Sequence, residues 1–184
     1  DVIQHMMVKA NEDKLQFERG LEQFNALRNV FAAQVDVLRR HLGMETLREA
    51  VRRTRVSMEK SRFSSGLRES MTDFFQQLND NLDRAATTTQ EIRAMMTAMY
   101  QKFSDEHGLA MVNPPDHSLT KYRKEMARLE GIFNERFNTL FSMLTVGQQQ
   151  LTARFFETLA SKVVQVFEIA NGETESWLKA LIAP

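Results

Sequence analysis

The side chains best suited to metal binding or acid–base chemistry in this sequence are four histidines, His5, His41, His107 and His117. A two-metal site in a helical bundle uses inward carboxylates and Glu-x-x-His pairs, and no histidine here has a glutamate three residues before it. His107 and His117 flank a segment with acidic neighbours, a pattern more typical of solvated loop residues than of a metal site. We therefore expect no catalytic residue, no metal ligand and no cofactor.

Nucleotide-binding loops need closely spaced glycines, because their backbone amides must converge on a phosphate. The seven glycines of this chain are never nearer to one another than 16 residues. This spacing excludes a phosphate-binding loop from the sequence. The chain is therefore expected not to be an enzyme, and an active site in the core of a helical bundle is the weakest of the alternatives.

Positive charge is concentrated in one short segment. The whole chain is neutral, with 24 basic and 24 acidic residues. Residues 39–68, however, hold nine basic and three acidic side chains, a local balance of +6. The candidate contact residues of this segment are Arg48, Arg52, Arg53, Arg55, Lys60 and Arg62.

Two interpretations of the basic segment stay open. Arg48, Arg52 and Arg55 lie four and three residues apart and share one face of a helix, with Leu47 and Val51 on a neighbouring face. Such a basic amphipathic helix can lie on an anionic membrane surface. The arginines can instead pair with acids on adjacent helices of the same molecule. Nucleic acid is not an expected partner, because no aromatic residues alternate with the arginines to stack on bases.

The elements that must position these residues are long helices. Along the first forty residues, steps of four and three alternate without a slip, and ten of the twelve positions are apolar. The positions are Ile3, Met7, Ala10, Lys14, Phe17, Leu21, Phe24, Arg28, Phe31, Val35, Leu38 and Leu42. This spacing predicts a helix over residues 2–42 that turns one stripe toward a partner, in the same chain or in another. Gly43 is expected to end it in the left-handed conformation.

Further helices are predicted over residues 45–62, 67–106 and 119–144, and a last one after Gly147. Gly108 and two adjacent prolines exclude a helix from much of residues 107–117, which we expect to form a loop. Ser65 is a candidate N-cap for the second long helix, and Asp116 or Ser118 for the third. Gly172 is a candidate interruption of the last helix.

These elements predict an all-α fold, an elongated antiparallel four-helix bundle in which residues 45–62 form a short accessory helix. We expect a single bundle over residues 1–184, excised from a larger protein. The absence of cysteine favours a reducing compartment, and hence a cytoplasmic location.

Phenylalanine and methionine are abundant, with 13 and 11 residues. Adjacent pairs at residues 74–75 and 155–156 put one ring on the apolar stripe and the next about 100° away around the helix. Filling the core is the simplest role for these phenylalanine and methionine side chains. Met95, Met96 and Met99 are the candidates for an adaptable contact surface.

Several stretches resemble the helical region of bacterial dynamin-like proteins. They are residues 99–109 (MYQKFSDEHGL), residues 114–122 (PPDHSLTKY), and an ending that runs from residues 154–157 (RFFE) to residues 177–184 (WLKALIAP). The resemblance implies a stalk that self-associates and contacts membrane, attached to a GTPase domain elsewhere in the same parent chain. No GTP-contacting residue is carried over to any position of this sequence.

The sequence thus predicts a non-catalytic stalk or assembly module with a basic tip, cytoplasmic and peripheral at a membrane. The alternative is a coiled-coil scaffold or a sensor-type helical bundle unrelated to GTPases. Residues 87–91 (TTTQE) are loosely similar to such a sensor bundle.

Overall fold

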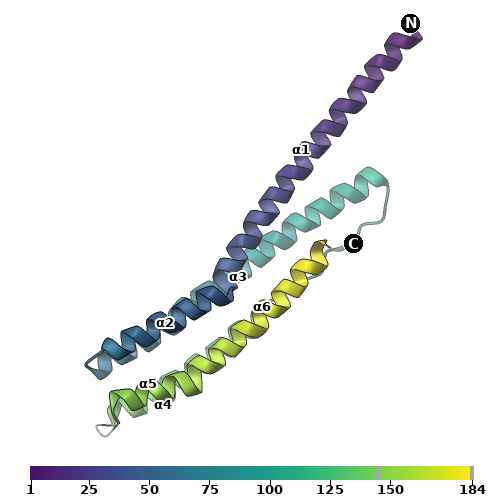
Figure 1. Cartoon of the computed structure of the whole chain (residues 1–184). Helices are drawn as coiled ribbons and strands as arrows, with labels where there is room; N and C mark the ends of the chain where they lie inside the picture. Colours follow the sequence, from purple (N-terminus) through teal and green to yellow (C-terminus); the bar gives the residue numbers. More distant parts are fainter. Residues whose placement is uncertain (144–145, 183–184) are drawn as a thin grey trace. The chain divides into compact units, whose positions relative to one another are not determined.

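The computed structural model describes residues 1–143 and 146–182, and every regular element in these ranges is a helix (Figure 1). The predicted all-α class is confirmed. Leu144 of the third predicted helix and the last two residues of the chain lie outside the described ranges. The chain divides into two compact units, residues 1–36 and residues 37–184, which are described one at a time.

The first unit consists of the greater part of one helix, α1 (Val2–Leu42). The last turns of α1 belong to the second unit. Asp1 caps the start, because its Oδ1 accepts the N–H of Ile3 at 3.2 Å. The unbroken steps of four and three leave α1 with an apolar stripe that one helix cannot bury by itself. Large side chains of the stripe, such as Phe17 and Phe24, are accordingly exposed.

The second unit begins with the end of α1. Gly43 has φ −68° and ψ 153°, which is extended backbone, so the predicted left-handed conformation was wrong. Glycine is needed there for a different reason. Its N–H donates to the Arg39 carbonyl at 2.7 Å, and a Cβ at this position would lie 2.2 Å from the same oxygen. Close approach of the backbone, rather than a positive φ, therefore requires this glycine.

The helices α2 (Met44–Lys60) and α3 (Ser64–His107) pack along each other, and both begin and end within three residues of the predicted bounds. The N-cap of α3 is Phe63, without a side-chain cap, so Ser65 is not the cap. Instead the Phe63 carbonyl accepts the N–H groups of Gly66 and Leu67. At the other end of α3, Gly108 does take the left-handed conformation, with φ 62°.

The proline-containing segment joins α3 to α4 (Thr120–Ser142) without regular structure. Neither predicted cap occupies the N-cap position of α4, which belongs to Leu119. Ser118 still helps the start of the helix, because its Oγ accepts the N–H of Thr120 at 3.3 Å. The segment is tied to the last helix by Trp177, whose Nε1–H donates to the Pro115 carbonyl at 2.8 Å.

The last helix contains a wide turn. It is formed by α5 (Gln148–Phe155), the π-helical turn η1 (Phe156–Ala160) and α6 (Ser161–Ile182), and Gly172 does not interrupt it. The apolar residues Leu151, Phe155, Leu159 and Val163 follow one another in steps of four. In a regular α-helix each such step drifts by about 40° around the axis. The wider π turn absorbs the drift, and all four side chains are buried.

A cluster of aromatic rings forms the core where α3, α4 and α5 meet. Phe155 lies 5.5 Å from Phe74, 6.3 Å from Phe75 and Phe133, and 6.1 Å from Phe137, measured between ring centroids. All five are buried, so these phenylalanines fill the core as expected. The three candidate methionines do not form an open contact surface, since Met96 is buried and Met95 and Met99 are half-buried.

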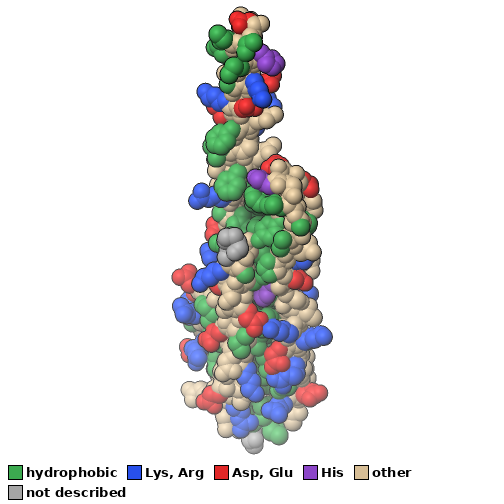
Figure 2. Space-filling view, turned by 90° about the vertical axis from the view of Figure 1, so that its right-hand side faces the viewer, with side chains coloured by type: hydrophobic (Ala, Val, Ile, Leu, Met, Phe, Trp, Pro, Cys, Tyr) green, Lys and Arg blue, Asp and Glu red, His purple; other side chains and the backbone are tan. Residues whose placement is uncertain are grey.

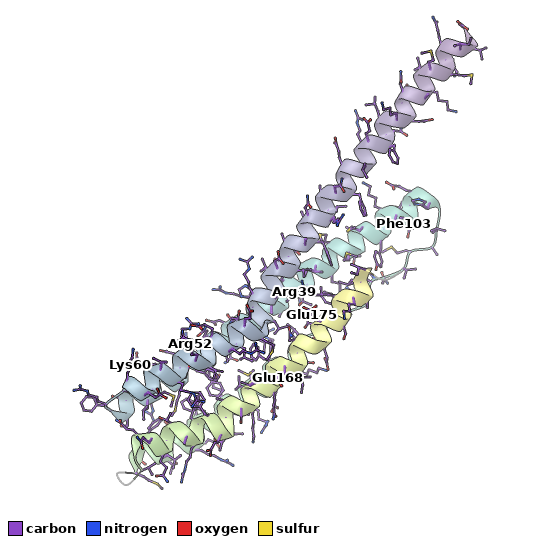
Figure 3. All side chains as sticks on the ribbon, in the orientation of Figure 1. Arg39, Arg52, Lys60, Phe103, Glu168 and Glu175 are labelled. Atoms are coloured by element: carbon purple, nitrogen blue, oxygen red, sulfur yellow. The ribbon has the colours of Figure 1, made fainter. Side chains whose placement is uncertain are left out.

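The number of helices fits the prediction, with α1, α3, α4 and the α5–η1–α6 helix as the long ones and α2 as the short one. In the second unit, Arg39 near the end of α1 forms a two-pronged ion pair with Glu175 of α6, at 2.8 and 3.0 Å (Figure 3).

Candidate basic contact surface on α2

The basic surface is built on the solvent side of α2. Four residues of this helix are buried, Leu47, Ala50, Thr54 and Met58, and they recur at the spacing of one helical face. Thr54 satisfies its hydroxyl by donating to the Ala50 carbonyl at 2.8 Å. Because this face packs inward, the basic residues between these positions must point outward. All six predicted contact residues are exposed.

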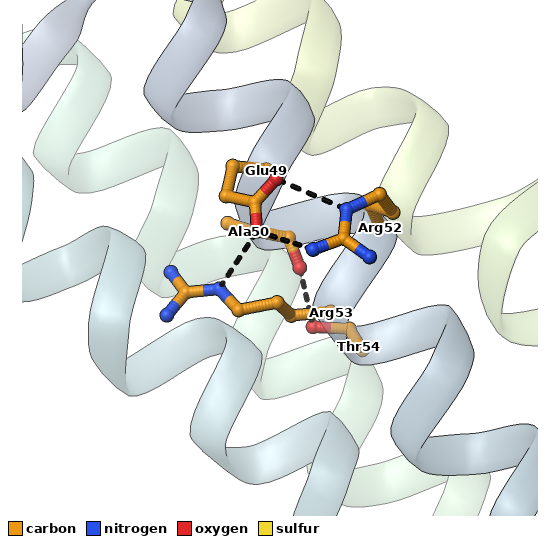
Figure 4. Close-up of polar contacts among 5 residues, drawn as sticks. All are labelled: Glu49, Ala50, Arg52, Arg53 and Thr54. Atoms are coloured by element: carbon orange, nitrogen blue, oxygen red, sulfur yellow. Dashed lines mark hydrogen bonds and ion pairs between the residues drawn. The ribbon is translucent and has the colours of Figure 1, made fainter.

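Two of the six basic residues share an acid of their own helix (Figure 4). Arg52 donates to both carboxylate oxygens of Glu49, at 2.6 and 3.0 Å, and Arg53 lies 3.9 Å from the same group. The hydrogen bonds from Arg52 lower the pKa of Glu49, so this acid stays ionised. Exposed pairs of this kind contribute little to stability. They do reduce the net positive charge of the surface by one.

A third basic residue is used in packing. The Arg55 guanidinium lies 4.1 Å above the ring of Phe156, the first residue of the π turn. This cation–π contact joins α2 to the last helix through an arginine that remains exposed. Arg55 therefore has a structural role in addition to its charge.

The remaining three basic residues are not neutralised by an ion pair in the part of the chain that the structure describes. Within residues 1–143 and 146–182, Arg48, Lys60 and Arg62 form no ion pair, and Lys60 projects from the last turn of α2 (Figure 3). None of the six predicted residues pairs with an acid on another helix in these ranges. The interpretation in which acids on adjacent helices neutralise the segment therefore holds for Arg39, which pairs with Glu175 of α6, and not for the six candidate contact residues.

An exposed aromatic residue lies next to Arg62 and close to Lys60 in the chain, and sequence reasoning missed it. Phe63 follows Arg62 directly in the turn between α2 and α3, and 73% of its surface is exposed. The signal that could have found it is its position outside both neighbouring apolar stripes. This turn and the connection between α4 and α5 lie at the same end of the second unit (Figure 1). Met143 in that connection is also exposed.

The histidines of the second unit that flank the proline-containing segment are accounted for by local contacts. The ring of His107 stacks on Phe103 at 4.2 Å, and its Nδ1 lies 2.9 Å from the Phe103 carbonyl. The Nε2 of His117 lies 2.9 Å from the Thr174 hydroxyl. In the part of the chain that the structure describes, no three histidine or carboxylate side chains are grouped so that they could hold a metal ion.

None of the described helices carries a stretch that is long and apolar enough to cross a membrane. Comparison with known proteins assigns no family to the chain, because no family model, no curated protein and no solved structure matches it.

Proposed function

We propose that this chain is a non-catalytic stalk or assembly module that contacts an anionic membrane surface through the basic end of α2. In this proposal it belongs to a bacterial dynamin-like GTPase whose nucleotide site lies in another domain of the parent chain. The GTPase rests on the sequence resemblance alone. The finer architecture that belongs to the proposal is an elongated antiparallel four-helix bundle.

The observation that carries the membrane contact is the set of exposed, unpaired charges on α2 and the turn after it, together with an exposed ring. Arg48, Lys60 and Arg62 have no ion pair in the described ranges, and Phe63 lies in the turn next to Arg62, whereas Arg48 lies about 18 Å from Lys60 along the helix. Basic side chains hold a protein near anionic headgroups, and an aromatic ring at the same place can enter the interface between headgroups and acyl chains. Each basic residue close to such a surface contributes about 1 kcal/mol. Three of them amount to an affinity gain on the order of 100-fold.

The leading alternative is a coiled-coil scaffold without a GTPase. The exposed apolar stripe of α1 favours it, because a scaffold needs only a surface for helix pairing. The two functions differ in the role of the basic end of α2, which a scaffold does not need. Binding to lipid therefore separates them.

The test is flotation with vesicles of phosphatidylcholine with or without phosphatidylserine. The chain is expected to float with the anionic vesicles only, and to detach as the salt concentration rises, because salt screens exposed charges. The variant Arg48→Glu/Lys60→Glu/Arg62→Glu should bind at least about 100-fold more weakly. Its helix content should stay unchanged, since all three side chains are exposed.

A matched control carries the same change of net charge elsewhere. Lys124, Lys162 and Lys179 are exposed lysines of α4 and α6, and their triple change to Glu should leave most of the flotation intact. Equal loss in both triple variants would mean that overall charge matters rather than the α2 surface. Absence of flotation by the unchanged chain would remove the membrane contact and leave the scaffold.

A further inference from the structure

The most exposed apolar surface of the described residues is the stripe of α1. Ile3, Phe17 and Phe24 are 68%, 71% and 55% exposed, and Met7 and Leu21 between them are exposed as well. Apolar side chains gather along the α1 rod in the space-filling view (Figure 2). A continuous stripe of large apolar side chains at heptad spacing is the sequence and surface of one strand of a coiled coil.

We propose that two copies of this chain pair through residues 3–28 of α1 as an antiparallel two-stranded coiled coil. The inference rests on the assembly part of the proposed function and gives that assembly a surface, a partner and an orientation. The basic surface of α2 takes no part in it. The occupant of the stripe is thus a second copy of the same helix.

The charges inside the stripe argue against a parallel pair. Lys14 and Arg28 occupy core positions of the heptad, because each follows an apolar core residue, Met7 or Leu21, by one heptad. In a parallel pair in register, each would face its own copy, and Asp13 would flank Glu18 of the second copy. Like charges in contact across an interface are unfavourable.

An antiparallel pair removes these conflicts. With Ile3 opposite Arg28 of the second copy, Met7 lies opposite Phe24, Ala10 opposite Leu21 and Lys14 opposite Phe17. Glu18 of the second copy is then at the same level as Lys14, on the same side of the seam, so opposite charges meet twice in the symmetric pair. Arg28 lies at the end of the overlap, where its long side chain can reach water.

The extent of the exposed surface selects this register. Sliding the two helices by one heptad toward their C-terminal ends would place Glu18 next to Glu18 of the second copy. Such a slide would also bring in Phe31, which is half-buried, whereas residues 2–26 are exposed throughout. The register with Ile3 opposite Arg28 therefore uses the surface that is open and avoids the acidic contact.

The interface is large enough to be stable. Phe17 and Phe24 supply four rings to the pair, and a phenylalanine can bury about 150–250 Å². The rings together with Ile3, Met7 and Leu21 from both copies exceed the roughly 1,000 Å² that a specific interface requires.

The mass of the full chain in solution tests the pairing. Sedimentation equilibrium or light scattering is expected to give twice the chain mass of 21.3 kDa. The variant Phe17→Glu/Leu21→Glu should be monomeric, with little change in helix content of the second unit. Leu15→Glu is the matched control, because Leu15 is equally apolar and 53% exposed but lies off the stripe. It should remain dimeric.

Charge exchange tests the register. Lys14→Glu places an acid beside Glu18 of the second copy in both halves of the pair, and should raise the dimer dissociation constant about tenfold. Adding Glu18→Lys restores opposite charges and should restore the wild-type constant. A double variant as weak as the single one would contradict the register.

Cross-linking tests the orientation, and the chain is suited to it because it contains no cysteine. Met7→Cys chains mixed with Phe24→Cys chains should form a disulfide between copies. Met7→Cys chains alone should not, because an antiparallel pair separates the two introduced thiols by about 25 Å along the helix. Cross-linking of Met7→Cys alone would overturn the antiparallel arrangement.

The outcomes for pairing and for lipid binding are separate. A monomer at every concentration would overturn the pairing, while flotation could still succeed. A dimer that survives Phe17→Glu/Leu21→Glu would place the contact elsewhere and overturn the α1 seam. Failure of flotation with an intact α1 dimer would remove the membrane contact alone.

Discussion

His117 is built into the packing of the second unit through its ring face and its edge. Its ring stacks on Trp177 with centroids 5.3 Å apart, and its Nε2 lies 2.9 Å from the hydroxyl of the buried Thr174. Burial lowers the pKa of His117, and nearby Lys121 lowers it further. The carboxylates of Glu173 and Asp116 act in the opposite direction without cancelling the effect of burial. The folded chain therefore favours the neutral ring.

This shift predicts how stability depends on pH. Since the pKa of His117 is lower in the folded chain than in the unfolded chain, the unfolded chain binds the proton first as the pH falls. Stability should be highest above the ordinary pKa of about 6.5 and decrease below it, until the folded ring is protonated as well. Urea unfolding between about pH 8 and about pH 5 measures this slope.

The variant His117→Gln separates the contribution of this histidine to the pH dependence of stability from the contributions of the other histidines. Its slope should be shallower than that of the wild type, and the part that remains belongs to groups such as His41, whose pKa burial also lowers. Identical slopes for the two proteins would show that His117 does not control the pH dependence.

The glycines give a second prediction at the scale of single residues. Gly131 lies inside α4 with open space where a Cβ would be, so Gly131→Ala should stabilise the chain by about 0.5–1 kcal/mol. Gly43→Ala should destabilise it by more than that, because the Cβ would meet the Arg39 carbonyl oxygen at 2.2 Å. Thermal unfolding followed by circular dichroism compares the two. Equal effects of the two changes would contradict the close approach at Gly43.

At the scale of elements, the π turn decides how the last helix meets its neighbours. It keeps Phe155 and Leu159 buried although they continue a series of steps of four. Its first residue, Phe156, contacts α2, because the Arg55 guanidinium lies above the Phe156 ring. The sequence showed the series of fours and the adjacent phenylalanines. It did not show the π turn. In such a turn the backbone hydrogen bonds span five residues instead of four, and this wider turn is favourable only when packing against the neighbouring helices fixes the helix on both sides of it.

Substitutions on either side of this turn test its role. Phe155→Ala removes a fully buried ring from the aromatic cluster and should destabilise the chain by about 3–5 kcal/mol. Phe156→Ala removes a half-buried ring with one cation–π contact and should cost about 1 kcal/mol or somewhat more. Denaturant unfolding measures both changes. A larger loss for Phe156→Ala would mean that the turn is held mainly by the contact with α2.

At the scale of the whole molecule, the sequence alone determined the helices. Steps of three and four with few glycines and prolines allow no other regular structure, so the all-α class and most helix bounds followed from local chemistry. The concentration of arginines after residue 39 was also visible, because net charge needs no coordinates. The caps of the helices were predicted less well than their bounds, as Gly43, Ser65 and Leu119 demonstrate, because a cap depends on the path of the backbone just beyond it.

Only the tertiary structure decided which faces are used. The stripe of α1 and the stripe of α3 follow the same periodicity, yet Phe17 is exposed whereas Phe74 is buried. It also showed that Arg48, Lys60 and Arg62 are left without an ion pair in the described ranges, while Arg52 binds Glu49 and Arg55 covers Phe156. The physical reason is the same in each case. Periodicity and charge are properties of a single helix, whereas burial and pairing depend on what lies opposite it.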